Sequence, residues 1–217
     1  MSGYTHIGKV CDLIVTEHPP PEKAALRRQL LAARRALSPE SRAATARALA
    51  RSALALPELA GARTVAAYVS VGAEPGTHEL LDALRAAGKR VLLPLLLPDN
   101  DLDWAAYEGP GSLAEAAHPG KMRLLEPSGP ALGPEAVTAA DAVLLPGLAV
   151  DGRGMRLGRG GGSYDRVLAR LERAGRHPAL VVLLYDEEVG GGGPAGPPPP
   201  PPPGGGGLKK RRIRRKG

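Results

Sequence analysis

The stretch LLPGLAVDGRGMRLGRGGGSYDRVLARL, residues 144–171, decides the fold class of this 217-residue chain. It opens with an apolar run typical of a buried strand, continues through a loop that contains six glycines, and ends in residues with helical periodicity. A strand, a glycine-rich loop and a helix in this order are typical of α/β proteins with a parallel sheet. Glycines in such a loop allow unusual φ angles and a close approach between backbone and ligand.

The segments on both sides of this stretch show the same alternation of strands and helices. Continuous apolar runs predict buried strands, and helical periodicity with capping signals predicts the helices. The predicted strands cover residues 64–71, 90–97, 102–108, 141–151 and 179–186, and the predicted helices cover 22–37, 39–56, 77–88 and 163–175. We therefore expect an α/β fold, a layered domain with a mostly parallel central sheet flanked by helices and with an N-terminal helical hairpin.

The first predicted helix carries an apolar stripe beside an arginine-rich face. The stripe consists of Leu26, Leu30, Ala33 and Leu37, at i, i+4, i+7 and i+11. This spacing is typical of an amphipathic helix. Ser38 and Pro39 follow as the N-cap and first position of the second helix.

Composition divides the chain into three parts. Residues 1–21 end in three prolines, and we expect them to form a disordered extension outside the fold. Residues 22–188 carry the alternating pattern and form the predicted α/β domain. Residues 189–217 are Gly and Pro repeats followed by a basic cluster, which cannot bury a core and predict a disordered tail.

The formal net charge of +7 belongs to that tail. Residues 190–217 contain seven cations and no acid, and without them the chain has 22 basic and 22 acidic residues. A formally neutral body argues against a strongly cationic globular domain that binds nucleic acid. Only the tail could hold nucleic acid, electrostatically and with little sequence preference, because it has no interleaved aromatic residues.

The compartment is predicted from what the sequence lacks. Its single cysteine, Cys11, excludes a disulfide framework and a Cys-rich zinc site. No apolar run approaches the roughly 18 residues of a membrane span, and the N-terminus does not resemble a signal peptide. We expect a cytoplasmic protein with no membrane partner.

The glycine loop has the groups that bind phosphate. The first N–H groups of the following helix lack internal partners and, with the glycines, can form an anion site. Arg156 and Arg159 add charged donors, and Asp165 is placed to hold Mg²⁺ beside a triphosphate. The loop lacks the Gly-Lys-Ser/Thr ending of a Walker A motif, and the Asp186 that would complete a Rossmann fingerprint lies beyond the next strand. A flexible loop before a helix cap is the structural alternative.

Three motifs, in order, resemble those of the 5-formyltetrahydrofolate cyclo-ligase (5,10-methenyltetrahydrofolate synthetase) family. Lys23-Ala24-Ala25-Leu26-Arg27 is similar to the family's Lys-x-x-Leu-Arg motif. The segment from Tyr68 to Glu74, followed by Thr77, is similar to its first-strand motif, which ends in a substrate-binding Glu. The segment from Leu145 to Asp165 resembles its glycine-rich signature. The resemblance covers about residues 22–188.

The resemblance implies a ligase of folate one-carbon metabolism. In the family, ATP phosphorylates the formyl oxygen of 5-formyltetrahydrofolate, and N10 then attacks the activated carbon. Phosphate leaves, and the products are 5,10-methenyltetrahydrofolate, ADP and phosphate. Phosphoryl transfer depends mostly on positioning and charge neutralisation, which this loop and its cations can supply. ATP, Mg²⁺ and a small-molecule folate are the implied ligands, and we expect a monomer.

The resemblance also assigns roles to individual residues. The implied catalytic residues are Lys23, Arg156, Arg159 and Tyr164. Val69 and Glu74 match substrate-binding positions, and Asp165 matches the magnesium ligand. The implied nucleotide-binding residues are Lys23, Ala24, Ala25, Leu26, Arg27, Arg156, Leu157, Gly158, Arg159, Gly160, Gly161, Gly162, Ser163 and Tyr164.

Each of these assignments has a structural alternative. A solvated helix face is the alternative for Lys23 and Arg27, and a hydrated loop carboxylate is the alternative for Glu74. Packing in the core is the alternative for Val69 and Tyr164. The remaining large aromatic residues of the central region, Trp104 and Tyr107, are interpreted as core residues in preference to a folate pocket.

The chain departs from the family pattern at three places. Gly161 stands where many relatives have Lys, and Ser163-Tyr164 stand where many have a Tyr pair. The tail replaces a last strand and an acidic site residue, which predicts a bare sheet edge. A shifted reading frame near residue 189 is one hypothesis for the tail. The alternative function is a catalytically impaired cyclo-ligase-like binding protein whose basic tail contacts nucleic acid.

Overall fold

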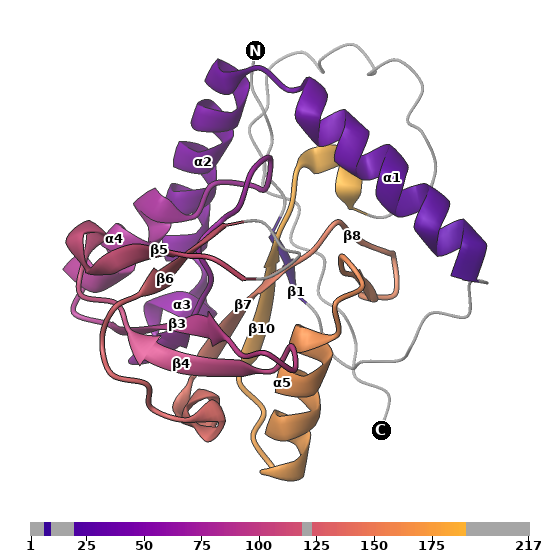
Figure 1. The fold of residues 1–217 in the computed structure, drawn as a ribbon. Coiled ribbons are helices and arrows are strands. Elements are labelled where there is room, and N and C mark those ends of the chain that lie inside the picture. The colour runs from indigo at the N-terminus through magenta and orange to yellow at the C-terminus, as the bar shows by residue number, and fades with distance from the viewer. Residues whose placement is uncertain (1–6, 10–19, 119–122, 190–217) are drawn as a thin grey trace.

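A six-stranded mixed sheet forms the centre of the computed structural model, which describes residues 7–9, 20–118 and 123–189 (Figure 1). The strand order is β1-β10-β7-β2-β3-β4. Their bounds are β1 Ile7–Lys9, β10 Ala179–Leu183, β7 Ala142–Pro146, β2 Thr64–Ala66, β3 Arg90–Leu96 and β4 Leu102–Ala106. The four inner strands are parallel, and β1 and β4 are antiparallel at the two edges. The predicted α/β fold with a mostly parallel sheet is therefore confirmed.

Five α-helices accompany the sheet in the described ranges: α1 Pro20–Ala36, α2 Pro39–Leu54, α3 Pro57–Ala60, α4 His78–Ala86 and α5 Ser163–Arg173. Three short 3₁₀ helices (η1 Pro110–Ser112, η2 Pro134–Ala139, η3 Asp186–Glu188) and two small hairpins complete the fold. The hairpins pair β5 Leu113–Ala116 with β6 Leu124–Pro127 and β8 Ala149–Val150 with β9 Arg156–Leu157. None of the described helices is long and apolar enough to cross a membrane.

Apolar side chains cover both faces of the sheet. Alternate strand residues such as Val65 and Leu144 pack with Leu49 of α2 and Leu81 of α4. The intervening residues pack with α5 and η2 in a second cluster. This alternation follows from the two-residue period of a strand and produces three layers.

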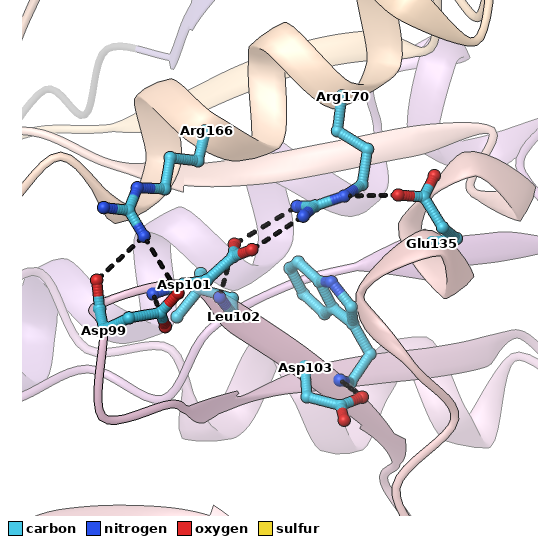
Figure 2. Close-up of polar contacts among 8 residues, drawn as sticks. Asp99, Asp101, Leu102, Asp103, Glu135, Arg166 and Arg170 are labelled. Atoms are coloured by element: carbon cyan, nitrogen blue, oxygen red, sulfur yellow. Dashed lines mark hydrogen bonds and ion pairs between the residues drawn. The ribbon is translucent and has the colours of Figure 1, made fainter.

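The helix α5 is also held by polar contacts (Figure 2). The guanidinium of Arg170 donates from Nε to Glu135 at 2.7 Å and from Nη1 and Nη2 to the two oxygens of Asp101 at 3.2 and 2.7 Å. One turn earlier, Arg166 donates to the backbone oxygen of Asp99 at 2.8 Å. These contacts attach α5 to the turn between β3 and β4 and to η2.

The strand β2 is shorter than predicted. Its ladder covers 64–66 rather than 64–71, although the N–H of Ala67 still donates to the carbonyl of Leu92 at 2.8 Å. Beyond this point Thr77 replaces the ladder: its hydroxyl accepts from the N–H of Ser70 and donates to the carbonyl of Tyr68, each at 2.9 Å. The chain therefore leaves the sheet early, and the Thr77 side chain supplies partners for the Ser70 N–H and the Tyr68 carbonyl.

The N-terminal segment contributes to the sheet, contrary to the prediction that residues 1–21 lie outside the fold. Residues Ile7–Lys9 form β1, which pairs antiparallel with the outer edge of β10. The bare edge predicted for this side of the sheet is covered along this length, because a backbone strand can satisfy an exposed ladder whatever its side chains. The predicted tail beyond residue 189 lies outside the described residues, as do 1–6 and 10–19.

The apolar stripe of α1 is not its buried side. Leu26, Leu30 and Leu37 are only half-buried and Ala33 is exposed, whereas Arg34 is buried. Figure 1 shows α1 and α2 diverging from their connection, so α1 does not lie flat on the hydrophobic core. It contacts the loops beyond the ends of the parallel strands instead.

Candidate active site

The candidate site lies at the carboxyl ends of β2 and β7. These strands are neighbours, but the chain runs from β2 to β3 on one side and later reaches β7 on the other. Ligands of open α/β sheets bind at such a switch point, where the two loops diverge and leave a crevice. The loop after β2 carries the predicted Glu74, and the loop after β7 carries the glycine-rich signature.

The glycine loop is anchored by its own side chains. The Asp151 carboxylate accepts from the N–H groups of Arg153 and Met155, each at 2.9 Å, and closes the turn between β8 and β9. Arg156 donates from Nη1 to the carbonyl of Pro146, at the end of β7, at 2.9 Å. These hydrogen bonds give the loop a defined conformation.

Two glycines turn the loop into α5. Gly160 has a φ of 96° and Gly162, the N-cap, has a φ of 77°, which are left-handed values that favour glycine. Among the residues that the structure describes, no side chain caps α5, so the first N–H groups of the helix are available to an anion. A Cβ at Gly161 would meet no atom of the described residues within 4 Å, so this part of the loop surface is open with respect to them.

Helix α1 contributes a cation to this loop. Arg27 of α1 donates from Nε to the carbonyl of Gly158 at 2.9 Å, and its guanidinium lies 3.6 Å from where a Cβ on Gly160 would be. Lys23 lies one helical turn before Arg27 on α1. The solvated helix face, the alternative for Arg27, is excluded by its contact with the loop.

The Glu74 carboxylate connects the two loops. One oxygen accepts from the N–H of Val71 at 2.8 Å, and the other lies 3.3 Å from Nε of Arg159. The Glu74 side chain is only 10% exposed, whereas that of Arg159 is 42% exposed. Glu74 is thus a largely buried carboxylate with a half-exposed cation beside it, and not the hydrated loop residue of the alternative.

Two tyrosines, the buried Tyr68 and the partly buried Tyr164, lie within electrostatic reach of this carboxylate. The pKa of Tyr164 is raised by burial and by the charge of Glu74, and the pKa of Tyr68 is raised by the same two causes. Both phenols therefore remain neutral at physiological pH and can act as hydrogen-bond donors. Within the described ranges the Tyr164 hydroxyl is buried and has no hydrogen-bond partner. Tyr164 also packs against both hydrophobic clusters, so the core alternative applies to its ring.

Arg156 and Asp165 form an ion pair at the start of α5. Nη2 of Arg156 donates to Asp165 at 2.8 Å, and the two side chains are 7% and 68% exposed. Burial lowers the pKa of Arg156, and the charge of Asp165 opposes this shift. No group of three or more His, Cys, Asp or Glu residues that could hold a metal occurs in the described ranges. Asp165 still suits Mg²⁺ bound with a nucleotide, which needs only one or two protein carboxylates beside the phosphate oxygens.

The other aromatic and apolar candidates are packing residues. Val69 and Trp104 are buried in the core, on opposite faces of the sheet. Tyr107 is buried too, and its hydroxyl donates to Asp82 at 2.6 Å. The preference for the core at Trp104 and Tyr107 is confirmed, and a substrate contact by Val69 stays a prediction.

Sequence reasoning missed Arg34. This residue of α1 is 1% exposed, donates to both oxygens of Glu188 at 2.6 and 2.8 Å, and donates from Nη2 to the carbonyl of Gly147 at 2.6 Å. The signal was present, because Lys23, Arg27 and Arg34 lie at i, i+4 and i+11 and form a stripe of their own. The leucine stripe on the same helix predicted a different buried face, so the cationic stripe was not recognised.

An α/β protein with an anion-binding glycine loop at its switch point is the class that this fold and site define. The family model described as "5-formyltetrahydrofolate cyclo-ligase family" matches residues 20–194, which includes the first six residues of the predicted tail. The chain therefore belongs to the 5-formyltetrahydrofolate cyclo-ligase family. This confirms the family predicted from the three motifs and, with it, the enzyme class, a ligase.

Individual relatives agree with the family model. A 5-formyltetrahydrofolate cyclo-ligase of Mycolicibacterium smegmatis is 45% identical over 154 residues, which are 69% of this chain and 76% of the relative. One from Escherichia coli K12 is 32% identical over 147 residues, 67% of this chain and 79% of the relative. The NMR structure of Aquifex aeolicus 5,10-methenyltetrahydrofolate synthetase matches with a TM-score of 0.63 and 28% identity, covering 77% of this chain and 79% of that one.

Proposed function

We propose that this chain converts 5-formyltetrahydrofolate to 5,10-methenyltetrahydrofolate, with conversion of ATP to ADP and phosphate. The observation that carries the proposal is the 3.3 Å contact between Glu74 and Arg159. It joins the motif that resembles a substrate-binding strand end to the motif that resembles a nucleotide loop. A reaction between two substrates needs both to be held within reach of each other.

The cationic side of the site is proposed to bind ATP. The co-substrate supplies the phosphoryl group that turns the formyl oxygen into a leaving group. Arg159, which is half-exposed, and Lys23 and Arg27 from α1 neutralise phosphate charge, while the first N–H groups of α5 donate to phosphate oxygens. Arg156 is already bonded to Pro146 and Asp165, so its role is to orient the loop and Asp165.

The opposite side, around Glu74, is proposed to bind the folate. The Glu74 carboxylate accepts a hydrogen bond from the Val71 N–H. Its contact with Arg159 at 3.3 Å is long, so replacing Arg159 with a ligand donor costs little free energy. A carboxylate in this position can accept paired hydrogen bonds from the N–H groups of a pterin ring. When the pterin ring replaces Arg159 as the partner of Glu74, Arg159 would be released toward the ATP phosphates. Folate binding would then favour ATP binding.

Magnesium is proposed to be held by Asp165 together with phosphate oxygens and water. When bound, the ion would neutralise charge that develops on the transferred phosphoryl group. Arg156 fixes the orientation of the Asp165 carboxylate through one of its two oxygens. Among the described contacts the other oxygen has no such bond to Arg156 and is the one proposed to face the ion. A monomer in the cytoplasm completes the proposal.

The direct test is an assay of the purified full-length chain with Mg-ATP and 5-formyltetrahydrofolate. We expect the near-UV absorbance of the methenyl product to appear, with ADP formed in equal amount. Reactions without ATP and without folate are the controls. A folded protein that gives no product, but binds RNA in a salt-sensitive manner that is lost on deletion of residues 190–217, would support the alternative function instead.

A further inference from the structure

We infer that Arg34 is a positioning residue: it fixes α1 against the loop after β7 and thereby sets where Lys23 and Arg27 stand in the nucleotide site. This inference rests on the proposed function for its kinetic consequences. The attachment of α1 itself can be tested without turnover.

The first argument is the burial pattern of α1. Among residues 22–36, whose burial is described, Arg34 is the one buried side chain. A helix usually docks through an apolar face, but here the leucines stay half-exposed. The position of α1 therefore depends on directed polar contacts, which define a geometry more narrowly than apolar contacts do.

The second argument is the number of partners that one guanidinium joins. Arg34 donates from Nε and Nη2 to the two oxygens of Glu188, at 2.6 and 2.8 Å, and from Nη2 to the carbonyl of Gly147 at 2.6 Å. Its guanidinium also lies over the ring of Tyr185, 5.6 Å from the centroid. Glu188 in turn accepts from the N–H of Tyr185 at 3.0 Å, which closes η3. One side chain thus fastens α1 to the ends of both β7 and β10.

The third argument is the relation between the two arginines of α1. Arg27 donates to the carbonyl of Gly158, and Arg34 donates to the carbonyl of Gly147. The two carbonyls lie at either end of the loop that contains the β8–β9 hairpin. With both contacts made, α1 is joined to the loop at two points, and loss of Arg34 removes one of these two contacts and leaves the one from Arg27 to Gly158.

The fourth argument is that this arrangement is poor for stability alone. Within the described ranges Nη1 of Arg34 is buried without a hydrogen-bond partner. A buried ion pair with an unsatisfied donor is often no more stabilising than apolar side chains of similar volume. The charge of Glu74 also acts on Arg34, so the pair stands within electrostatic reach of the site.

The test compares three variants of the full-length chain. Arg34→Met removes the contacts with Glu188 and Gly147. Arg170→Met removes a comparably buried arginine from the contacts of α5, and Arg35→Met removes the exposed neighbour on α1. We expect Arg34→Met to raise the KM for ATP about ten- to a hundredfold with a smaller change in kcat, as misplacement of binding groups does. Arg170→Met and Arg35→Met should leave the KM for ATP within about twofold.

A second measurement separates positioning from stability. Hydrogen exchange of the α1 amides should accelerate in Arg34→Met relative to the amides of α5, and the reverse should hold in Arg170→Met. Arg34→Lys, which keeps the charge but not the fork, should fold and show an intermediate KM; it also serves if Arg34→Met fails to fold. Equal KM values in the wild type, Arg34→Lys and Arg34→Met, or unchanged α1 exchange, would overturn the inference. If the wild type shows no turnover, the proposed function fails, and α1 exchange still decides the inference.

Discussion

Two arginine-centred regions of this molecule are built from the same groups to different ends. In the α5 contacts of Figure 2, every guanidinium nitrogen of Arg170 donates to a carboxylate. At the carboxyl ends of β2 and β7, Nε of Arg156, Nη1 of Arg34 and the hydroxyl of Tyr164 are buried and unpartnered within the described residues. The first region is complete as it stands, and the second has hydrogen-bonding capacity left over.

The difference teaches how to separate a structural cluster from a binding site. An unpartnered donor alone is not sufficient, since the indole Nε1 of Trp104 is also unpartnered in the core. At the candidate site, however, the charge of one carboxylate, Glu74, acts on the pKa values of Tyr68, Tyr164 and Arg34 together. Unsatisfied donors that gather around one carboxylate and an open glycine loop indicate a place for a polar ligand.

Of the substitutions that test this comparison, we expect the largest effect on activity from Asp165→Ala. We expect Asp165→Ala to lower kcat/KM by roughly 100- to 1000-fold, the usual cost of losing one electrostatic contact to a transition state. The Asp165 side chain is 68% exposed, but Arg156, 7% exposed, loses its counter-ion, so the variant should fold with a lowered melting temperature. Asp165→Asn is the matched control, since it keeps an acceptor for Arg156 without the charge. Full activity in Asp165→Asn would refute the metal role and leave only the orientation of Arg156.

At the other region, Arg170→Met should cost stability and not activity. The substitution removes both hydrogen bonds from the Arg170 guanidinium to the Asp101 carboxylate. Because hydrogen bonds to charged groups are lost, we expect the free energy of unfolding to fall by about 1.5–3 kcal/mol. Urea denaturation would measure this fall, with Arg166→Met, at the more exposed neighbouring contact, as a control of smaller effect. A drop in kcat/KM of the folded variant would show that the two regions are not separable.

Within the candidate site, Glu74→Gln should separate the two substrates. We expect the KM for 5-formyltetrahydrofolate to rise about ten- to a hundredfold, because a charged acceptor is lost, while the KM for ATP stays level or falls as Arg159 is released. Steady-state kinetics with each substrate varied in turn measure this. Glu79→Gln, an exposed position on α4, is the control. If the KM rose equally for both substrates, the site would not be divided into a folate-binding side and a phosphate-binding side.

The pH dependence of stability should reveal the contribution of the contact between Arg170 and Asp101. The hydrogen bond from Arg170 lowers the pKa of Asp101 from its ordinary value of 3.8. A carboxyl with a depressed folded pKa stabilises the fold above that ordinary value and loses this contribution as the pH falls through the folded pKa. The stability difference between the wild type and Arg170→Met should therefore shrink below about pH 4. Urea midpoints at a series of pH values would check it, and a constant difference would contradict it.

The smallest expected effect is a gain. Gly161 has open space where a Cβ would stand and is not among the residues with positive φ, so a side chain is admissible there. Gly161→Lys should lower the KM for ATP roughly threefold, within the range of an exposed ion pair. Gly161→Gln, of similar length but uncharged, is the control. An unchanged KM in Gly161→Lys would place the phosphates away from this part of the loop.

Much of this was predictable from local sequence, and the failures have physical causes. The helix 77–88 and the strand 90–97 were predicted to within two residues because their signals are short-range. The predicted strand 64–71 was too long because the side chain of Thr77, seven residues beyond Ser70, bonds the Ser70 N–H and the Tyr68 carbonyl in place of a neighbouring strand. The role of residues 7–9 could not be predicted, because pairing with β10 depends on which sheet edge is free.

The sequence by itself determined the alternation of strands and helices, the glycine loop before α5, and the three motifs that identified the family. Periodicity, capping and turn chemistry act over a few residues, so a linear pattern records them. Only the tertiary structure decided that Glu74 meets Arg159, that Arg34 and not the leucine stripe is the buried side of α1, and that β1 lies beside β10. These contacts join residues far apart in the chain, and packing in three dimensions selects them.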